Sequence, residues 1–368
     1  MIQRVAIISP YALSVFGGVQ EQALAMSREL SRRGVEVLLV VPDEKDQENH
    51  DTPARVERFG RRVSMRANGS RAPLTLSPSA AFRARAAVRD FGPDVVHFHE
   101  PFAPVLGWAT LRAHEVASVA TFHRSGDGPA TRLTKPLLRR LARGVDVALS
   151  VSPAARDTLA AASGLASEVL FNGFETDRFV ASPRQRGHEI IVFTVGRLEE
   201  RKGVAVAIEA VRRHNDRARV PWQLVVAGDG PERARLQALA AHDERVVFLG
   251  AVDDEQKRAW LRRATVFVAP ATRGESFGMV LLEAMASEVA VVASDIEGYR
   301  QAADGHATLV APGDPDALAA GIEHALASES TERLDAARRH AESWSMTRLM
   351  DLYLARYESS HELFSRSR

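Results

Sequence analysis

Residues 274–283 read GESFGMVLLE, and this stretch decides how the chain is expected to fold. It follows an apolar run, residues 265–270, that is typical of a buried strand, and it opens an apolar segment, residues 279–287, that is typical of a helix. Gly274 and Gly278 allow the backbone to turn tightly and to come close to a ligand. The first N–H groups of a helix carry a partial positive charge. The stretch therefore predicts a strand–turn–helix unit whose turn binds phosphate.

Two carboxylates flank the expected turn. Glu275 precedes the helix and Glu283 lies within it, so their separation is about 12 Å at about 1.5 Å per helical residue. Carboxylates that far apart cannot act as a close pair on one bond. They suit hydroxyl groups at the two ends of a long polar ligand whose phosphates lie between them. A nucleotide-sugar has that form, and the plain alternative is an ordinary helix with one solvated glutamate.

A second charged turn supports the nucleotide-sugar hypothesis. Residues 196–203 read GRLEERKG and follow residues 190–195, an apolar run that is typical of another buried strand. Ligand groups in open α/β sheets lie at the carboxyl ends of the strands. Arg197 and Lys202 occupy such a place, and together they can neutralise a diphosphate through charge-assisted hydrogen bonds.

Strand-like and helix-like runs alternate along the whole chain, which predicts an α/β fold with parallel sheets. The alternation pauses at residues 172–179, and a polar loop, residues 182–188, follows. We therefore expect two doubly wound, Rossmann-like domains that face each other across a cleft. The expected N-terminal domain spans residues 1–173 and the expected C-terminal domain spans residues 174–345.

The composition is that of an ordinary globular chain: 368 residues, 45% hydrophobic and 26% charged. No apolar run approaches the ~20 residues that span a bilayer, and the N-terminus reads as a strand rather than a signal peptide. The absence of cysteine excludes disulfides, thiol catalysis and cysteine metal sites. We expect a cytoplasmic protein.

The net charge is only +1, but residues 55–89 hold nine arginines against one acidic residue, Glu57. Aromatic side chains are sparse in this region, which disfavours nucleic acid as the partner. An anionic membrane surface or a phosphorylated acceptor fits better. A merely solvated arginine-rich surface is the alternative.

These motifs resemble those of the retaining family-4 glycosyltransferases of GT-B fold, and the similarity covers essentially the whole chain. Glu275 and Glu283 match the two glutamates of that family, and Arg197 and Lys202 match its diphosphate-binding pair. Four N-terminal stretches are similar to those of the actinobacterial phosphatidyl-myo-inositol mannosyltransferases: FGGVQ at 16–20, NGS at 68–70, HEP at 99–101 and ATFH at 120–123. The resemblance implies that a C-terminal helix, residues 346–368, crosses back onto the N-terminal domain.

The resemblance assigns roles in donor binding. Arg197 and Lys202 would hold the diphosphate, Glu275 the sugar hydroxyls and Glu283 the ribose hydroxyls. The turn after Glu275 would add backbone donors, and a glycine pair in the first strand–helix turn would lie beside the transferred sugar. The remaining donor-binding residues are therefore Ser276, Phe277, Gly278, Met279, Gly17 and Gly18.

The resemblance also implies an acceptor site in the N-terminal domain. His123 ends an expected strand, residues 118–122, and would orient the acceptor and the reacting sugar without acting as a nucleophile. With Glu275, Arg197 and Lys202 it completes the expected catalytic set. A polar loop around residues 68–71 would hold inositol phosphate. The expected acceptor-binding residues are Tyr11, Gln20, Asn68, Ser70, Arg71, His123 and Arg124.

His97, His99 and Glu100 have a spacing that can suit a metal, but no further convergent ligand is evident. We expect no metal and no cofactor, because the nucleotide-sugar is a co-substrate. The chain departs from the family pattern at Glu288 and Ala290, where many relatives carry Gly and Pro.

The hypothesis is a retaining hexosyltransferase that moves mannose from GDP-mannose to a phosphatidylinositol-type lipid, with peripheral contact to an anionic membrane. Arg83, Arg85 and Arg89 lie on the helix that meets lipid in the resembled enzymes, although this helix is less densely basic than theirs. The alternatives are a UDP-sugar-dependent transferase with a soluble acceptor, a nucleotide-sugar epimerase or hydrolase on the same fold, and a non-catalytic nucleotide-sugar-binding protein.

Overall fold

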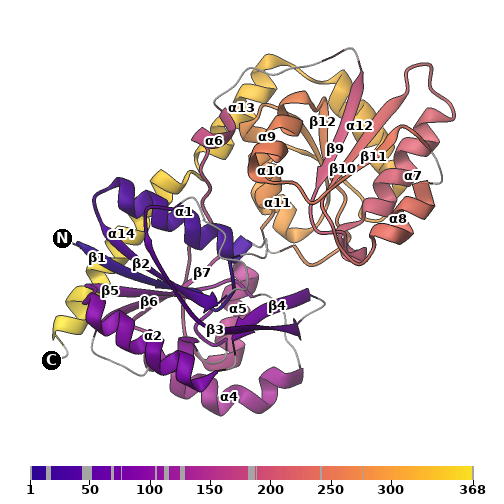
Figure 1. Cartoon of the computed structure of the whole chain (residues 1–368). Coiled ribbons are helices and arrows are strands. Elements are labelled where there is room, and N and C mark those ends of the chain that lie inside the picture. Colours follow the sequence, from indigo (N-terminus) through magenta and orange to yellow (C-terminus); the bar gives the residue numbers. More distant parts are fainter. Residues whose placement is uncertain are drawn as a thin grey trace. The chain divides into compact units, whose positions relative to one another are not determined.

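The structure, a computed structural model, describes residues 2–13, 18–43, 52–67, 70–75, 77–103, 106–111, 116–124, 129–180, 187, 189–240, 243–275 and 277–366. The chain divides into two compact units. Unit 1 comprises Met1–Phe174 with Met346–Arg368, and unit 2 comprises Glu175–Ser345 (Figure 1).

Unit 1 is an α/β unit built on an eight-stranded sheet of order β4-β3-β2-β1-β5-β6-β7-β8. All neighbouring strands are parallel except β3 and β4, which form an antiparallel pair. The strands are β1 (Arg4–Ile8), β2 (Glu36–Asp43), β3 (Arg55–Ala67), β4 (Ser70–Thr75), β5 (Val95–His99), β6 (Ala117–Phe122), β7 (Val147–Ser150) and β8 (Glu168–Val169). The helices are α1 (Gly18–Arg32), α2 (Pro78–Phe91), α3 (Leu106–Leu111), α4 (Pro129–Ala142), α5 (Pro153–Ser163) and α14 (Met346–Arg366).

Helices cover both faces of this sheet because its central strands are apolar on both sides. In β1, Val5 and Ile7 belong to the core that faces α1 and α14, whereas Ala6 and Ile8 belong to the core that faces α2, α3 and α5. Successive strand residues point to opposite faces. A strand that is buried on both faces therefore reads as one continuous apolar run.

Helix α14 belongs to unit 1, although the chain reaches it from unit 2. Its Tyr353 and Tyr357 are fully buried. The hydroxyl of Tyr357 lies 3.0 Å from Nδ1 of His97, and the hydroxyl of Tyr353 lies 3.3 Å from Oγ1 of Thr121. Figure 1 shows this helix running along the sheet of unit 1. The crossing that the resemblance implied is confirmed.

Unit 2 has a six-stranded, fully parallel sheet of order β11-β10-β9-β12-β13-β14. Its strands are β9 (Ile190–Val195), β10 (Trp222–Ala227), β11 (Val246–Gly250), β12 (Val266–Ala269), β13 (Ala290–Ser294) and β14 (Thr308–Val310). Its helices are α6 (Asp177–Val180), the 3-10 turn η1 (Glu200–Lys202), α7 (Val204–Asn215), α8 (Arg233–Ala240), α9 (Asp254–Arg263), α10 (Met279–Ala286), α11 (Glu297–Ala303), α12 (Pro315–Ala327) and α13 (Thr331–Glu342).

The strand order of unit 2 reverses direction between β9 and β12, which lie side by side at the centre of the sheet. One face packs on α7, α8 and α12, which supply Val211, Leu236 and Ile322 to the core. On the other face, Phe193 and Phe267 contact each other, and Phe193 stacks on Trp260 of α9. The doubly wound fold predicted from the alternating runs is therefore confirmed.

Several elements differ from the sequence-based expectation. The antiparallel pair β3–β4 occupies a region in which no strand was expected, and Ser70 and Arg71 lie on β4 rather than in a loop. Helix α11 and strand β14 were also not expected. Among the described residues, no helix has both the length and the apolar character needed to cross a membrane.

Candidate active site

The loops that follow β9 and β12 meet at the carboxyl edge of the unit 2 sheet. Gly203 ends the loop after β9 with a φ of +68°, and a Cβ atom there would lie 1.9 Å from the carbonyl oxygen of Pro270. Only glycine permits this approach. Because the strand order reverses between β9 and β12, the loops lie where open α/β sheets bind ligands.

Three cations and two carboxylates face each other in these loops. Nζ of Lys202 lies 2.8 Å and Nη1 of Arg201 lies 2.7 Å from Oε1 of Glu275. Arg201 also contacts Glu199 at 2.9 Å, and Nε of Arg197 lies 3.3 Å from the other oxygen of Glu199. The group retains one positive charge in excess. Since the side chains of Arg197, Arg201 and Lys202 are 36%, 28% and 21% exposed, an anion can reach them.

Gly278 forms the turn that begins α10. Its φ is +104°, and an added Cβ atom would lie 2.7 Å from Cδ1 of Tyr299. The helix starts at Met279, and its first N–H groups have no partner within the helix. The ring of Phe277 is buried against the ring of Trp344, with centroids 4.8 Å apart. A contact from Phe277 to a ligand therefore has to come from its backbone.

Glu283 lies on α10 and is only 5% exposed. Its Oε1 accepts a hydrogen bond from Nζ of Lys257 at 3.0 Å, whereas Oε2 has no partner among the residues that the structure describes. Burial raises the pKa of Glu283, and the charge of Lys257 opposes that rise. A buried oxygen without a partner costs free energy. Glu283 is therefore suited to accept a hydrogen bond from a ligand hydroxyl.

Glu100 holds the turn that follows β6 in unit 1. Its Oε1 accepts the backbone N–H of His123 at 2.5 Å and that of Arg124 at 2.6 Å. Burial raises the pKa of Glu100, and these two N–H groups lower it. Glu100 has a φ of +46°, which is uncommon for a residue other than glycine. The conformation of Glu100 therefore fixes the position of His123.

His123 and His99 form a pair of neutral imidazoles. Nε2 of His123 lies 3.0 Å from Nδ1 of His99, so one ring donates and the other accepts. Burial lowers the pKa of His123 to about 3 and lowers the pKa of His99 well below its usual value. At neutral pH, His123 can exchange hydrogen bonds with a substrate but cannot neutralise a phosphate.

Comparison with known families identifies the chain. Residues 16–178 match the model "Glycosyltransferase Family 4", and residues 175–344 match the model "Glycosyl transferases group 1". The phosphatidyl-myo-inositol mannosyltransferase of Mycobacterium leprae is 36% identical over 323 residues, which cover 86% of this chain and 85% of the relative. The chain belongs to the family-4 glycosyltransferases.

Further comparisons agree with this identification. A GDP-mannose-dependent alpha-mannosyltransferase of Mycolicibacterium smegmatis is 31% identical over an alignment 391 positions long, which covers 97% of each chain. The solved sucrose-phosphate synthase of Thermosynechococcus elongatus superposes with a TM-score of 0.77 at 20% identity and covers 99% of this chain and 100% of its own. The glycosyltransferase therefore has the GT-B fold.

The structure brings some of the predicted donor residues of this glycosyltransferase together. Arg197, Lys202 and Glu275 lie within one group of ion pairs. Gly18 begins α1, and a Cβ atom added there would meet no atom of the other described residues within 4 Å, its chain neighbours excepted. The predicted residues Gly17, Ser276 and Asn68 lie outside the described residues.

The predicted acceptor residues are in varied environments. Gln20 is buried, and its Nε2 donates to the carbonyl of Ala12 at 3.3 Å, so this side chain supports the loop after β1. Tyr11 lies in the same loop, and burial raises the pKa of its phenol. Ser70 and Arg71 pair with β3, and their side chains lie outside the described ones.

Sequence reasoning missed several residues of the site. Arg201 stands in the same charged run as Lys202, so the run itself could have identified it. Lys257 meets Glu283 across 26 positions of sequence, for which no local pattern exists. Glu199 and Glu100 were read only as parts of motifs, and the structure shows that they position the neighbouring cations and His123, respectively.

The histidine spacing in β5 has a structural explanation. Nε2 of His97 lies 3.1 Å from Oγ1 of Thr121, and Nδ1 lies 3.0 Å from the hydroxyl of Tyr357. His97 is therefore a core histidine with both ring nitrogens in use. Across the described segments, no group of three or more His, Asp or Glu residues is placed to hold a metal ion.

Proposed function

We propose that this glycosyltransferase moves mannose from GDP-mannose to a hydroxyl of a phosphatidylinositol-type lipid, with retention of configuration. The observation that carries the proposal is the group of ion pairs that joins Arg197, Arg201 and Lys202 to Glu199 and Glu275 at the reversal of the strand order. This group suits a nucleoside diphosphate. The names of the two relatives, which specify mannose, GDP and phosphatidyl-myo-inositol, support the proposed donor and acceptor.

In the proposed reaction, the bond between the sugar carbon and the diphosphate oxygen breaks, and negative charge develops on the diphosphate. Arg197 and Lys202 would stabilise that charge. The backbone at Gly278 and Met279, together with Ser276, would add hydrogen-bond donors. Glu275 would bind sugar hydroxyls, and the unpartnered oxygen of Glu283 would accept from a ribose hydroxyl.

The acceptor hydroxyl would attack the sugar carbon from the face that the diphosphate leaves. Its proton would pass to an oxygen of the departing diphosphate, so the reaction needs no close nucleophile–base pair from the protein. His123, as a neutral imidazole, would orient the acceptor and the sugar by hydrogen bonds.

Helix α2 supports the proposed contact with a membrane. Phe82 is 71% exposed, and no other large hydrophobic residue among the described ones is as exposed. Arg83 and Arg89 lie on the same helix and are also exposed. An exposed aromatic side chain beside cations is typical of a helix that lies on an anionic bilayer surface.

Calorimetric titration with GDP, UDP, ADP and their sugars tests the donor. We expect GDP and GDP-mannose to bind most tightly. We expect Lys202→Gln to lower the affinity for GDP by about tenfold or more, since a hydrogen bond to a charged group contributes about 1.5–3 kcal/mol. Arg219→Gln, an exposed arginine in another loop of unit 2, is the control. Preference for UDP-sugars would overturn the donor assignment, and sugar release to water without transfer would indicate a hydrolase.

Transfer of labelled mannose to phosphatidylinositol in vesicles tests the acceptor. We expect product in anionic vesicles and weaker sedimentation of the Phe82→Ser protein with them. Val220→Ser removes an exposed apolar side chain from unit 2 and serves as the control. Transfer to a soluble hydroxyl compound but not to lipid, or equal sedimentation of both variants, would contradict the lipid acceptor and the role of α2, respectively.

A further inference from the structure

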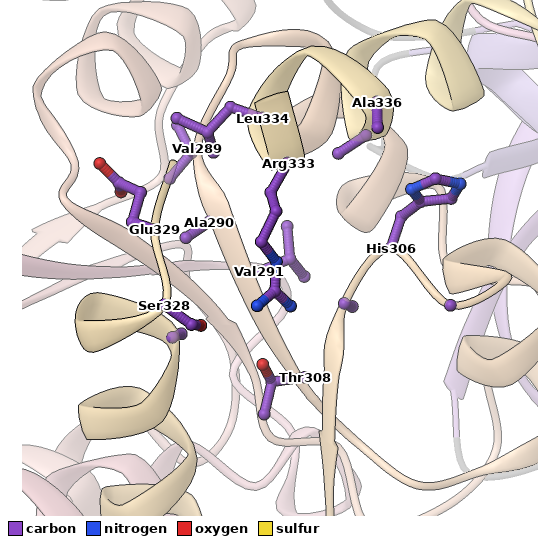
Figure 2. Close-up of a pocket in the computed structure, with 14 residues that line it drawn as sticks. Val289, Ala290, Val291, His306, Thr308, Ser328, Glu329, Arg333, Leu334 and Ala336 are labelled. Atoms are coloured by element: carbon purple, nitrogen blue, oxygen red, sulfur yellow. The ribbon is translucent and has the colours of Figure 1, made fainter. Parts of the chain in front are cut away.

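A cavity of about 180 Å³ lies on unit 2 at the edge of the sheet opposite the charged loops (Figure 2). Its walls are the first residues of β13 and β14, the end of α12 and the first half of α13. Since the strands of this sheet are parallel, residues before and at the start of β13 and β14 lie away from the carboxyl edge that carries Lys202 and Glu275. The cavity is therefore separate from the proposed donor site.

Arg333 contributes a guanidinium group to the lining of this cavity. Figure 2 shows its side chain extending from α13 toward the strand residues of the lining, and the residue is exposed to solvent. Among the described residues, no carboxylate forms an ion pair with this guanidinium. Glu329 is the acidic residue of the lining, and Figure 2 shows its carboxylate directed away from Arg333.

The lining of the cavity indicates which ligand it suits. The cavity has a volume of about 180 Å³ and opens to solvent. Thr308 and Ser328 line it with hydroxyl groups, and Val291 and Leu334 provide apolar wall. A guanidinium with nearby hydroxyl donors is suited to a phosphate group, and the apolar wall is suited to a short carbon chain.

We propose that this cavity is a binding site for a small phosphorylated metabolite, whose phosphate pairs with Arg333 and accepts hydrogen bonds from Thr308 and Ser328.

The position of the cavity gives its ligand a route to the proposed donor turn. His306 lines the cavity and stacks on His340, with ring centroids 4.7 Å apart. His340 meets Trp344 at 6.2 Å, and Trp344 meets Phe277 of the donor turn at 4.8 Å. Occupation of the cavity should therefore change the affinity of the turn for nucleotide, and this step alone rests on the proposed function.

Titration of inorganic phosphate and glycerol phosphate into the Lys202→Gln protein tests the site, because that substitution should weaken phosphate binding at the donor loops. Binding is followed by calorimetry and by the imidazole NMR signals of His306. We expect saturable binding of glycerol phosphate, at least a tenfold loss on adding Arg333→Gln, and no loss on adding Arg219→Gln. Tighter binding of glycerol phosphate than of inorganic phosphate supports a metabolite, whereas equal binding reduces the site to one for free phosphate.

The proposed site would be wrong if glycerol phosphate still bound equally well after Arg333→Gln. It would also be wrong if glycerol phosphate did not bind to the Lys202→Gln protein. The coupling is tested in the protein without substitutions by measuring GDP affinity with and without glycerol phosphate. We expect Arg333→Gln to abolish the change in GDP affinity, and no change in the unsubstituted protein would overturn the coupling. Failure of GDP to bind, with Arg333-dependent binding intact, would count against the proposed function and not against this site.

Discussion

His97 is fully buried in unit 1, and both of its ring nitrogens lie within hydrogen-bonding distance of hydroxyl groups. Burial lowers its pKa from 6.5 to about 3. The unfolded chain therefore binds a proton at His97 below pH 6.5 that the folded chain does not bind until about pH 3. Stability is consequently lost as the pH falls through this window.

Between pH 7 and pH 5, His97 should lower the free energy of unfolding by about 2 kcal/mol. The change is about 1.4 kcal/mol for each pH unit below the pKa of His97 in the unfolded chain. We expect His97→Gln, which cannot titrate, to show a pH dependence of unfolding that is smaller by that amount. Urea denaturation of both proteins at the two pH values measures it. Parallel losses in the two proteins would show that His97 does not titrate on unfolding.

Glu288 has a left-handed backbone conformation. This residue has a φ of +56°, which is uncommon for a residue other than glycine. Its carboxylate lies 3.3 Å from Nε of Arg338. Glu288→Gly and Glu288→Ala lose that ion pair equally, but only the alanine retains the cost of a left-handed conformation, about 1–2 kcal/mol. We expect the glycine variant to be the more stable by about 1 kcal/mol in urea denaturation. The reverse order, which helix interiors show, would contradict this conformation.

At the scale of the element, the turn before α10 depends on its contact with α11. A Cβ atom on Gly278 would lie 2.7 Å from the ring of Tyr299, whereas a Cβ atom on Gly305 would meet nothing within 4 Å. Both glycines have a positive φ, so Gly305→Ala is a control for the backbone cost alone. We expect Gly278→Ala to lower the free energy of unfolding by about 1–3 kcal/mol more than Gly305→Ala does. Gly278→Ala should also lower the affinity for GDP in calorimetric titration. If the two variants lose the same free energy of unfolding and bind GDP equally, the contact with Tyr299 is unimportant.

The elements that sequence predicted well are those with a continuous apolar run. Strands β9 and β12 were located from residues 190–195 and 265–270 because both faces of these strands are buried. The pair β3–β4 was missed because its arginine-rich sequence has no such run. Strand β14 has three residues and α11 has seven, and elements this short are stabilised by tertiary packing rather than by local preference.

The same distinction applies to the candidate site. Arg197, Lys202 and Glu275 could be predicted because each follows a strand whose carboxyl end is evident in the sequence. The pairing of Lys257 with Glu283 could not, because it depends on how α9 and α10 pack against each other. The neutral state of His123 likewise depends on burial and on the adjacent ring of His99, which only the folded chain establishes.

At the scale of the whole molecule, the last segment of sequence completes the first unit. Helix α14 supplies Met346, Met350, Tyr353 and Tyr357 to the core of unit 1, and each buried side chain of this size contributes about 1.5–3 kcal/mol. Their sum is comparable to the net stability of a domain, which is about 5–15 kcal/mol. Residues 175–345, by contrast, form the core of unit 2 without α14.

Truncation after Ser345 should therefore unfold unit 1 and leave unit 2 intact. We expect limited proteolysis to degrade residues 1–174, while the remaining unit still binds GDP in calorimetric titration and transfers no sugar. Truncation after Ser360 keeps all five buried core residues of α14, which include Leu349, and should leave unit 1 resistant to protease. If unit 1 stays resistant in the shorter chain, the packing of α14 is dispensable for its fold. If GDP binding is lost with unit 1, the donor nucleotide needs both units, because the loops after β9 and β12 would still be present in the folded remainder.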